Sequence, residues 1–460
     1  MKKINLLWLF MAFLPTLLYA QKRNELSKKT MMMMKRTLLL GLVLLGWITS
    51  FAQIKGNNIQ ISITPNHADW NYQVGEEAVL KVTVMKGRCL LKDVKVDYEA
   101  GPEMYSDVKK QNMVLKDGTM TWKAKMQQPG FYKFKVWTVI QGKKYEGLCT
   151  VGFSPERLQP ITTCPADFDS FWQQSLSDAR RVPLEGNKRL LPERCTDKVN
   201  VYEVSFHNNQ WGSRTFGILC VPTKPGTYPA LLRVPGAGVR PYQGDIWTAS
   251  QGAITLEIGV HGIPVTMPQG VYDNLAAGAL NGYWDFNTDD RDRMTYKRIF
   301  IGAIRAIDYI ATLPEWDGKT LGVTGSSQGG MLSLVCGALD KRVTFIGVVH
   351  GAMCDHTASL QSRACGWPHY FYGQKHPDDM KVKVSRYYDG VNFAKRIHCN
   401  SWFSFGYIDE VVPPTTSYST YNVVPGNKVL RPYQATGHFL FQEQWDEWQQ
   451  WIFKQLNIQQ

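Results

Sequence analysis

The chain has 460 residues, of which 44% are hydrophobic and 12% aromatic, enough for a large core and two or three domains. Residues 1–52 carry eight Lys or Arg and one Asp or Glu, so only +6 of the net charge of +13 belongs to the rest of the chain. These charges form no runs, which excludes the clustered basic face of a nucleic-acid-binding protein.

Two export-like segments occupy residues 1–52. Each has a charged start, a short apolar stretch and a small residue before Gln, at Ala20 and at Ala52. Both apolar stretches are shorter than a typical transmembrane helix. We therefore expect a signal peptide with its real start within residues 31–34, no stable membrane insertion after cleavage, and a secreted or periplasmic protein. A signal peptide followed by a membrane anchor is the alternative.

Nine cysteines are scattered along the chain without a CxxC pair, an arrangement that disfavours a zinc cluster. Their odd number leaves at least one thiol unpaired within the chain. Cys354 and Cys365 are one candidate disulfide, but most of the nine are expected to be buried apolar side chains. We expect no metal and no other cofactor.

Residues 53–155 have the pattern of an all-β domain. Alternating apolar and polar residues predict strands at 59–63, 79–84, 94–98, 120–124 and 131–139. Asp117-Gly118 is a hairpin signal. Short strands at this spacing predict an immunoglobulin-like β-sandwich. Four aromatic residues are candidates either for its core or for a sugar-stacking platform: Trp70, Tyr72, Trp122 and Trp137.

Residues 156–460 alternate between strand and helix patterns. Apolar strands are predicted at 230–234, 254–260, 321–323, 345–349, 402–405 and 429–434. Helices are predicted from about 167 to 180, from 299 to 313, from 331 to 339 and from 441 to 456. Fully apolar strands between amphipathic helices indicate an α/β domain with a mostly parallel sheet.

Residues 324–330 read T-G-S-S-Q-G-G and lie between a predicted strand and a predicted helix. G-x-S-x-G in this setting is typical of a nucleophile elbow. The tight turn needs small residues two positions before and two after the serine. Gly325 and Gly329 meet this need only if Ser327 is central, so Ser327 is the candidate nucleophile and Ser326 a bystander. The alternative is a glycine-rich turn without chemistry.

A nucleophilic serine needs a base, and the base needs an orienting carboxylate. In proteins whose nucleophilic serine lies on such a strand–turn–helix elbow, the three residues follow one another in the chain as Ser, then acid, then His. Among the histidines after Ser327, only His438 lies beyond a late strand and just before the last helix. Asp409, or less favourably Glu410, follows the preceding strand. Asp409 and His438 are therefore the candidate acid and base.

Two backbone N–H groups are predicted to stabilise an oxyanion. One belongs to Gln328, at the start of the helix after the elbow. The other belongs to Ala237 or Gly238, in a loop of small residues at 235–238 that lets the backbone approach a substrate. The alternative for this loop is an ordinary strand end.

Several motifs occur together in residues 160–456. They are PADFDSFW at 165–172, YKR at 296–298, LPEWD at 313–317, GSSQGG at 325–330, YDGVNFA at 388–394 and GYID at 406–409. In their order and spacing they resemble the acetyl xylan esterase and cephalosporin C deacetylase family, carbohydrate esterase family seven of the α/β-hydrolase superfamily.

This resemblance implies an α/β-hydrolase fold with a metal-free triad that removes acetyl groups from sugar hydroxyls. It assigns Ser327, Asp409 and His438 to the triad, and it supports Gln328 and Ala237 as oxyanion donors. The implied partner is an acetylated carbohydrate substrate, and a homo-oligomer is left open. A serine peptidase or a broad-specificity carboxylesterase of the same fold is the alternative, as is a binding protein that kept the elbow without turnover.

Three segments depart from the family pattern. Residues 261–263 are His-Gly-Ile where the family usually has Arg-Gly-Gln, residues 235–237 are Pro-Gly-Ala in place of His-Gly-Tyr, and residues 439–441 are Phe-Leu-Phe in place of Glu-Gly-Gly. These departures bear on substrate and assembly more than on chemistry. Aromatic residues available for stacking on sugar rings, or for packing, are Tyr283, Trp284, Trp367, Tyr370 and Tyr372.

Overall fold

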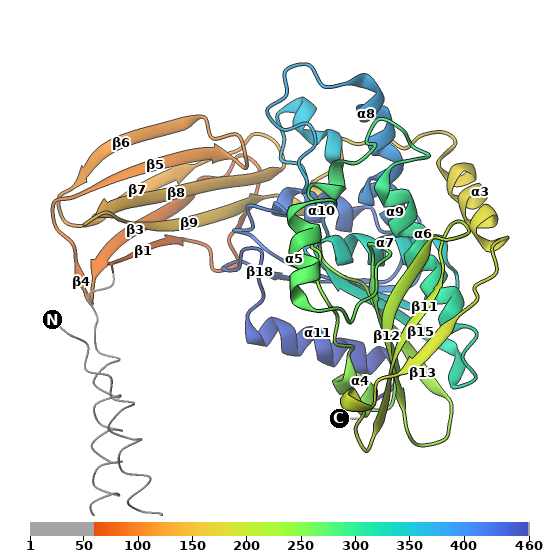
Figure 1. Cartoon of the computed structure of the whole chain (residues 1–460). Coiled ribbons are helices and arrows are strands. Elements are labelled where there is room, and N and C mark those ends of the chain that lie inside the picture. The colour runs from red at the N-terminus through yellow and green to blue at the C-terminus, as the bar shows by residue number, and fades with distance from the viewer. Residues whose placement is uncertain (1–58, 459–460) are drawn as a thin grey trace, which may run out of the picture. The chain divides into compact units, whose positions relative to one another are not determined.

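The computed structural model describes residues 59–458, and a nine-stranded sheet is its largest element (Figure 1). The strand order is β10-β11-β12-β14-β13-β15-β16-β17-β18. β10, β11, β12 and β14 pair antiparallel, whereas the five pairings from β14 through β18 are parallel. The predicted mostly parallel sheet is therefore confirmed. The strands are β10 (Asn187–Leu190), β11 (Val199–His207), β12 (Arg214–Pro222), β13 (Tyr228–Arg233), β14 (Ile254–Gly259), β15 (Trp316–Ser326), β16 (Phe345–Val349), β17 (Asn400–Gly406) and β18 (Lys428–Tyr433).

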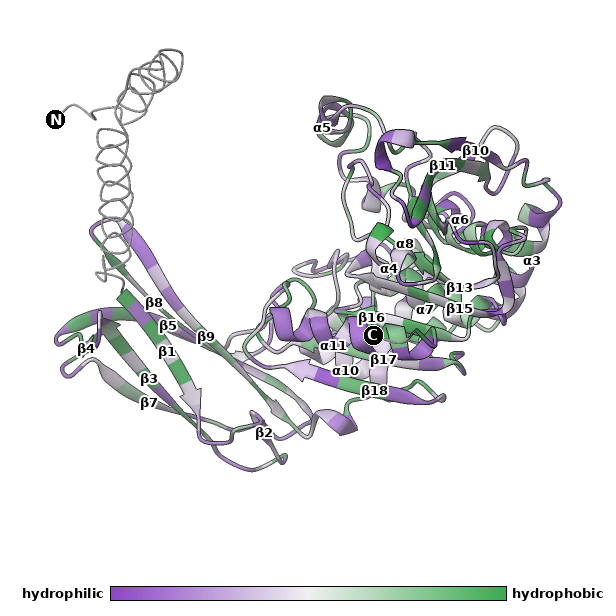
Figure 2. Cartoon of the chain, turned by 90° about the horizontal axis from the view of Figure 1, so that it is seen from below, coloured by the Kyte–Doolittle hydropathy of each residue, from purple (hydrophilic) through white to green (hydrophobic). Residues whose placement is uncertain are grey.

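Helices cover both faces of this sheet because successive strand side chains point to opposite sides. On β13, Ala230 and Leu232 belong to the core under α6 and α7, whereas Leu231 belongs to the core under α11. Figure 2 shows the layers from below, with apolar residues gathered along the central strands. The α-helices are α3 (Phe168–Arg180), α4 (Ile246–Ser250), α5 (Gln269–Ala277), α6 (Thr295–Ile310), α7 (Gln328–Leu339), α8 (Asp379–Ser385), α9 (Gly390–Ala394), α10 (Pro414–Asn422) and α11 (Gln442–Gln455).

The predicted helical face at the centre of the chain is buried as expected. Ile299, Ala303, Ile307 and Ile310 of α6 are all at most 2% exposed. They recur at helical spacing, so one stripe of α6 packs on the sheet. Short 3-10 helices complete the connections: η1 (Pro155–Arg157), η2 (Pro192–Arg194), η3 (Tyr283–Asp285), η4 (His356–Gln361) and η5 (Arg386–Tyr388).

Residues 59–153 form two further sheets, one of β1, β3, β4 and β7 and one in the order β2-β9-β8-β5-β6. Trp122 of the first sheet stacks on Phe134 of the second, with ring centroids 5.3 Å apart, so these two aromatic residues lie between the sheets. The strands are β1 (Ile59–Pro65), β2 (Asn71–Tyr72), β3 (Ala78–Lys86), β4 (Cys89–Leu90), β5 (Val94–Pro102), β6 (Val108–Leu115), β7 (Thr119–Ala124), β8 (Gly130–Ile140) and β9 (Lys143–Phe153).

The hairpin predicted at Asp117-Gly118 is wrong in its pairing. The turn exists, and Asp117 Oδ1 accepts hydrogen bonds from the N–H and hydroxyl of Thr119. However, β6 before it pairs with β5, and β7 after it pairs with β3. The turn therefore carries the chain from one sheet to the other, a choice made by partners distant in sequence.

The candidate disulfide is also wrong. Cys354 and Cys365 are both free and buried, as are the thiols of Cys149, Cys220 and Cys336. Within residues 59–458, no helix combines the length and the apolar character needed to cross a bilayer. The two export-like segments lie outside the described residues.

Candidate active site

Ser327 lies at a sharp turn between β15 and α7. Its backbone has φ 61° and ψ −120°, in a region that residues other than glycine rarely occupy. The turn is held from both sides, because the Ser327 N–H donates to Val349 O (2.9 Å) and the Ser327 carbonyl accepts from the N–H of Ala352 (3.0 Å). Ser327 therefore lies on the tight, strained turn that the elbow motif predicts.

Two glycines make room for the turn. A Cβ atom added to Gly325 would lie 2.4 Å from the carbonyl oxygen of Val234, and one added to Gly329 would lie 2.3 Å from the same oxygen. Both distances are far below van der Waals contact. The loop after β13 therefore packs directly against the elbow, and only glycine fits at these two positions.

Gly329→Ala is expected to abolish esterase turnover or to unfold the elbow, because the obstructing oxygen belongs to backbone that cannot swing aside. Gly270→Ala is the matched control, since a Cβ at this other helical glycine has nothing within 4 Å. We expect the control to keep full activity and an equal or higher melting temperature. Hydrolysis of an aryl acetate and thermal unfolding, measured on both variants, check this prediction. A fully active Gly329→Ala protein would contradict it.

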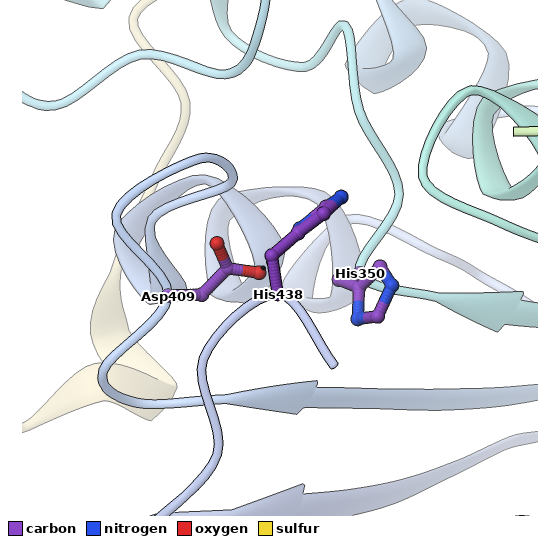
Figure 3. Close-up of side chains that lie close together, drawn as sticks. All are labelled: His350, Asp409 and His438. Atoms are coloured by element: carbon purple, nitrogen blue, oxygen red, sulfur yellow. Dashed lines mark hydrogen bonds and ion pairs between the residues drawn. The ribbon is translucent and has the colours of Figure 1, made fainter. Parts of the chain in front are cut away.

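Asp409 and His438 follow β17 and β18, neighbouring parallel strands whose carboxyl ends meet at one edge of the sheet. His438 Nδ1 lies 2.8 Å from Asp409 Oδ2 (Figure 3). The other carboxylate oxygen, Oδ1, accepts the N–H groups of Val411 and Val412, both at 2.8 Å. The Asp409 carboxylate is completely buried and bonded on both oxygens, so its orientation toward His438 is fixed.

Glu410, the less favoured candidate acid, points elsewhere. Its carboxylate pairs with Lys133 at 3.3 Å and with Lys135 at 3.0 Å, two residues of β8. Asp409 is therefore the residue of this pair that the fold brings to His438.

The elbow ends β15, in the same parallel series as β17 and β18, so all three candidates emerge at one edge of the sheet. No hydrogen bond joins Ser327 to His438 in the described part of the chain. Bonds of this kind are often long in enzymes without substrate and tighten in the complex.

The loop after β13 lies close to the elbow. A Cβ on Gly236 would lie 3.9 Å from Ser327 Cβ. The N–H of Gly238 donates to the Tyr283 hydroxyl at 3.4 Å, whereas no partner is recorded in residues 59–458 for the N–H of Ala237. Of the two N–H groups left open by the sequence, that of Ala237 is the one without a partner in residues 59–458.

The carbonyl groups of this loop are tied to side chains. Arg240 donates to the carbonyls of Gly236 (2.8 Å) and Ala237 (3.1 Å), and His261 Nε2 lies 2.9 Å from Gly238 O. His261 belongs to the segment at 261–263 that departs from the family pattern. In this chain, its contact with Gly238 O anchors the loop after β13.

Gln328 does more than the sequence predicted. Its N–H is the first of α7 and has no intrahelical acceptor, which leaves it free for an oxyanion. Its side chain is completely buried, and Oε1 accepts the hydroxyls of Tyr283 (2.6 Å) and Tyr296 (2.9 Å), while Nε2 donates to Pro235 O (3.3 Å). These bonds brace the elbow against the loop after β13. No sequence signal marks them, because their partners lie 32 to 93 residues away.

Comparisons with known proteins identify the family of this chain. The family model described as acetyl xylan esterase (AXE1) matches residues 156–455. The chain belongs to the acetyl xylan esterase family. It is therefore a carboxylic ester hydrolase, and the family supports hydrolysis of acetyl esters.

Three relatives illustrate the similarity. The acetyl esterase Axe7A of Xylanibacter ruminicola is 36% identical over 417 residues, which cover 88% of this chain and 93% of the relative. An acetyl xylan esterase from Paenibacillus sp. R4 has a TM-score of 0.57 at 27% identity, over 65% of this chain and 98% of its own. Acetyl xylan esterase 1 from Thermoanaerobacterium sp. JW/SL YS485 has a TM-score of 0.57 at 24% identity, over 65% and 97% of the two chains, and shows the α/β-hydrolase-like fold.

Most of the aromatic residues proposed for sugar stacking pack on one another in this esterase. Tyr283 is 1% exposed, the rings of Trp284 and Trp367 lie 5.4 Å apart, and Tyr370 donates to Trp284 O at 2.7 Å. Tyr372 is 46% exposed. Tyr372 is the candidate of this set with the most free ring surface for a sugar.

One group of side chains in the described residues has the spacing of a metal site. The ligand-type atoms of His350, Asp409 and His438 all lie within 4.8 Å of one another (Figure 3). An ion bound there would compete with the hydrogen bond between Asp409 and His438. The sequence assigned no catalytic role to His350.

Proposed function

We propose that this esterase removes acetyl groups from the sugar hydroxyls of xylan-type oligosaccharides through Ser327, His438 and Asp409. The observation that carries the proposal is the hydrogen-bonded pair of buried Asp409 and partly exposed His438, at the strand edge that also presents the Ser327 elbow. The names of the relatives, acetyl esterase and acetyl xylan esterase, support acetylated xylan as the substrate class.

In the first half of the reaction, His438 Nε2 takes the proton of Ser327 Oγ as that oxygen attacks the acetyl carbonyl carbon. The carbonyl oxygen becomes an oxyanion, which accepts hydrogen bonds from the N–H groups of Gln328 and Ala237. Asp409 holds the proton of His438 on Nδ1 and stabilises the imidazolium. The imidazolium then protonates the sugar oxygen, the ester bond breaks, and the acetyl group stays on Ser327.

In the second half, water replaces the sugar. The water oxygen attacks the acetyl carbonyl carbon while His438 takes a proton from that water. The same two N–H groups stabilise the second oxyanion. The proton returns to Ser327 Oγ as acetate leaves. Each proton that His438 accepts is thus given back, and the enzyme is regenerated.

The test is acetate release from acetylated xylo-oligosaccharides by protein beginning near Gln53. Ser327→Ala should lower kcat by about 10⁴-fold or more. Ser177→Ala, an exposed serine on α3, is the control and should match the wild type. An active Ser327→Ala protein would refute the nucleophile. Hydrolysis of an aryl acetate without release from xylo-oligosaccharides would keep the triad and refute xylan as the substrate.

We further propose that residues 53–155 are an immunoglobulin-like sandwich ahead of a catalytic domain at 156–460, and that the protein is exported with its leader removed. The charged and apolar segments of residues 1–52 support export. Sequencing the N-terminus of the protein recovered from the periplasm or medium tests it. A chain that keeps residues 37–52 in the membrane fraction would favour an anchor instead.

A further inference from the structure

His350 follows β16, the strand between the elbow strand β15 and the acid-bearing strand β17. Its N–H donates to Ser404 O on β17 at 2.7 Å. Its backbone has φ 30°, which is uncommon outside glycine and persists where the surroundings hold it. The chain therefore fixes this histidine at the edge of the sheet where the candidate catalytic residues emerge.

The side chain of His350 makes two contacts there. Its Nε2 lies 2.6 Å from Ser326 Oγ, the neighbour of the candidate nucleophile. Its ring lies against the ring of His438, with centroids 4.3 Å apart and planes inclined by 39°. His350 thus contacts both the elbow and the candidate base, whereas Asp409 holds the base from the opposite direction (Figure 3).

The charge of His350 suits this position. The residue is 3% exposed, and its Nδ1 is buried without a hydrogen-bond partner in residues 59–458. Burial, and after it the neighbouring His438, lowers the pKa of His350 to about 3. A neutral ring can remain against His438 when that residue becomes a cation during turnover, whereas a charged ring would repel it.

We infer that His350 is a positioning residue for the proposed triad, holding the imidazole of His438 by ring contact and the elbow by its hydrogen bond to Ser326. This inference rests on the proposed roles of Ser327 and His438. The one hydrogen bond that His438 donates to Asp409 fixes one atom of the base and leaves the ring free to tilt. The ring of His350 supplies the second constraint and keeps water from that face of His438.

Three variants separate the two contacts. His350→Asn tolerates the left-handed backbone and keeps hydrogen-bonding capacity, but removes the ring. His350→Phe keeps a ring, and the apolar side chains beside His350, which include Leu334, Val348 and Phe403, suit it. Ser326→Ala removes only the hydrogen bond. His356→Asn is the control for the loss of a buried imidazole. The His356 ring is buried like that of His350, but it packs on Tyr370 rather than on His438.

The measurement is the pH dependence of kcat and kcat/KM for an aryl acetate. His350→Asn should lower kcat by about 10- to 100-fold with little change in KM, since a misplaced base slows chemistry rather than binding. The acid limb of kcat/KM should move to higher pH, because water admitted to the open face favours charged His438. His350→Phe should recover most of kcat and the wild-type acid limb, and His356→Asn should leave both unchanged.

The acid limb of kcat/KM also depends on the titratable groups near the base in the described part of the chain. Asp409 and His350 contact His438, and Glu103 and His369 lie near enough to influence Asp409. All four are unchanged in Ser326→Ala. That variant should lose less activity than His350→Asn.

Other outcomes would overturn the inference. One such outcome is a His350→Asn enzyme with the kcat and the acid limb of the wild type. Another is an equal loss of kcat in His350→Asn and His350→Phe with an unshifted acid limb, and this result would mean that His350 has a purely structural role. Ser327→Ala is run alongside. If it retains activity, the proposed triad fails, and the His350 result is judged against a different nucleophile.

Discussion

Replacing Asp409 by Asn is expected to lower kcat by about 10⁴-fold and to leave KM within a few fold. Asp409 Oδ1 accepts two backbone N–H groups, from Val411 and Val412, so the amide oxygen of the variant would take that place. The amide NH₂ would then face His438 Nδ1, which could only accept. The imidazole would carry its proton on Nε2, the tautomer that cannot take a proton from Ser327.

Steady-state kinetics on an aryl acetate and on acetylated xylo-oligosaccharides measure this effect. Glu410→Gln is the matched control, one residue along the same loop, because its carboxylate pairs with Lys133 and Lys135 rather than with His438. The control should keep wild-type kcat. A large loss in Glu410→Gln with an active Asp409→Asn would reverse the assignment of the acid.

The second large effect concerns stability in acid. Burial lowers the pKa of His356 to about 3, against an opposing influence from Asp355, and His369 adds to the lowering. An unfolded histidine titrates near pH 6.5. The folded pKa is the lower one, so the stabilising contribution is complete above pH 6.5 and is lost as the pH falls toward 3. Between pH 7 and pH 4 this one residue should cost about 3 kcal/mol of unfolding free energy.

His356→Leu should remove that loss. Neither ring nitrogen of His356 has a hydrogen-bond partner among the described residues, so leucine, of similar volume, breaks no polar contact. Denaturant unfolding at pH 7 and pH 4 should show a smaller fall in free energy for the variant. His376→Leu, at an exposed histidine, controls for surface effects. Its free energy of unfolding should fall between pH 7 and pH 4 by as much as that of the wild type. Equal falls in all three proteins would refute the role of His356.

Patterns local in the chain predicted six of the nine strands of the larger sheet, β13 to β18, and four of the nine α-helices that the structure describes, α3, α6, α7 and α11. They missed β10, β11 and β12. The strand β16 and the helix α11 differ from their predicted bounds by one residue or less at each end. Strands β6 and β9 were not predicted, because β6 is mostly exposed and β9 begins with polar residues, so neither shows a clear apolar alternation. Strand order also escaped prediction, since it depends on pairing between residues distant in sequence.

By itself, the sequence determined that Ser327 is the central residue of the elbow and that an acid and a histidine follow it in order. Glycine spacing and chain order are local constraints, so they can be read without a structure. Tertiary structure decided three other matters. Asp409 rather than Glu410 meets His438, and the ring of His350 lies against the ring of His438. The N–H of Gly238 is bonded to Tyr283, whereas that of Ala237 has no partner among the residues that the structure describes. Each depends on a contact between residues that lie on different strands or loops, which no local periodicity encodes.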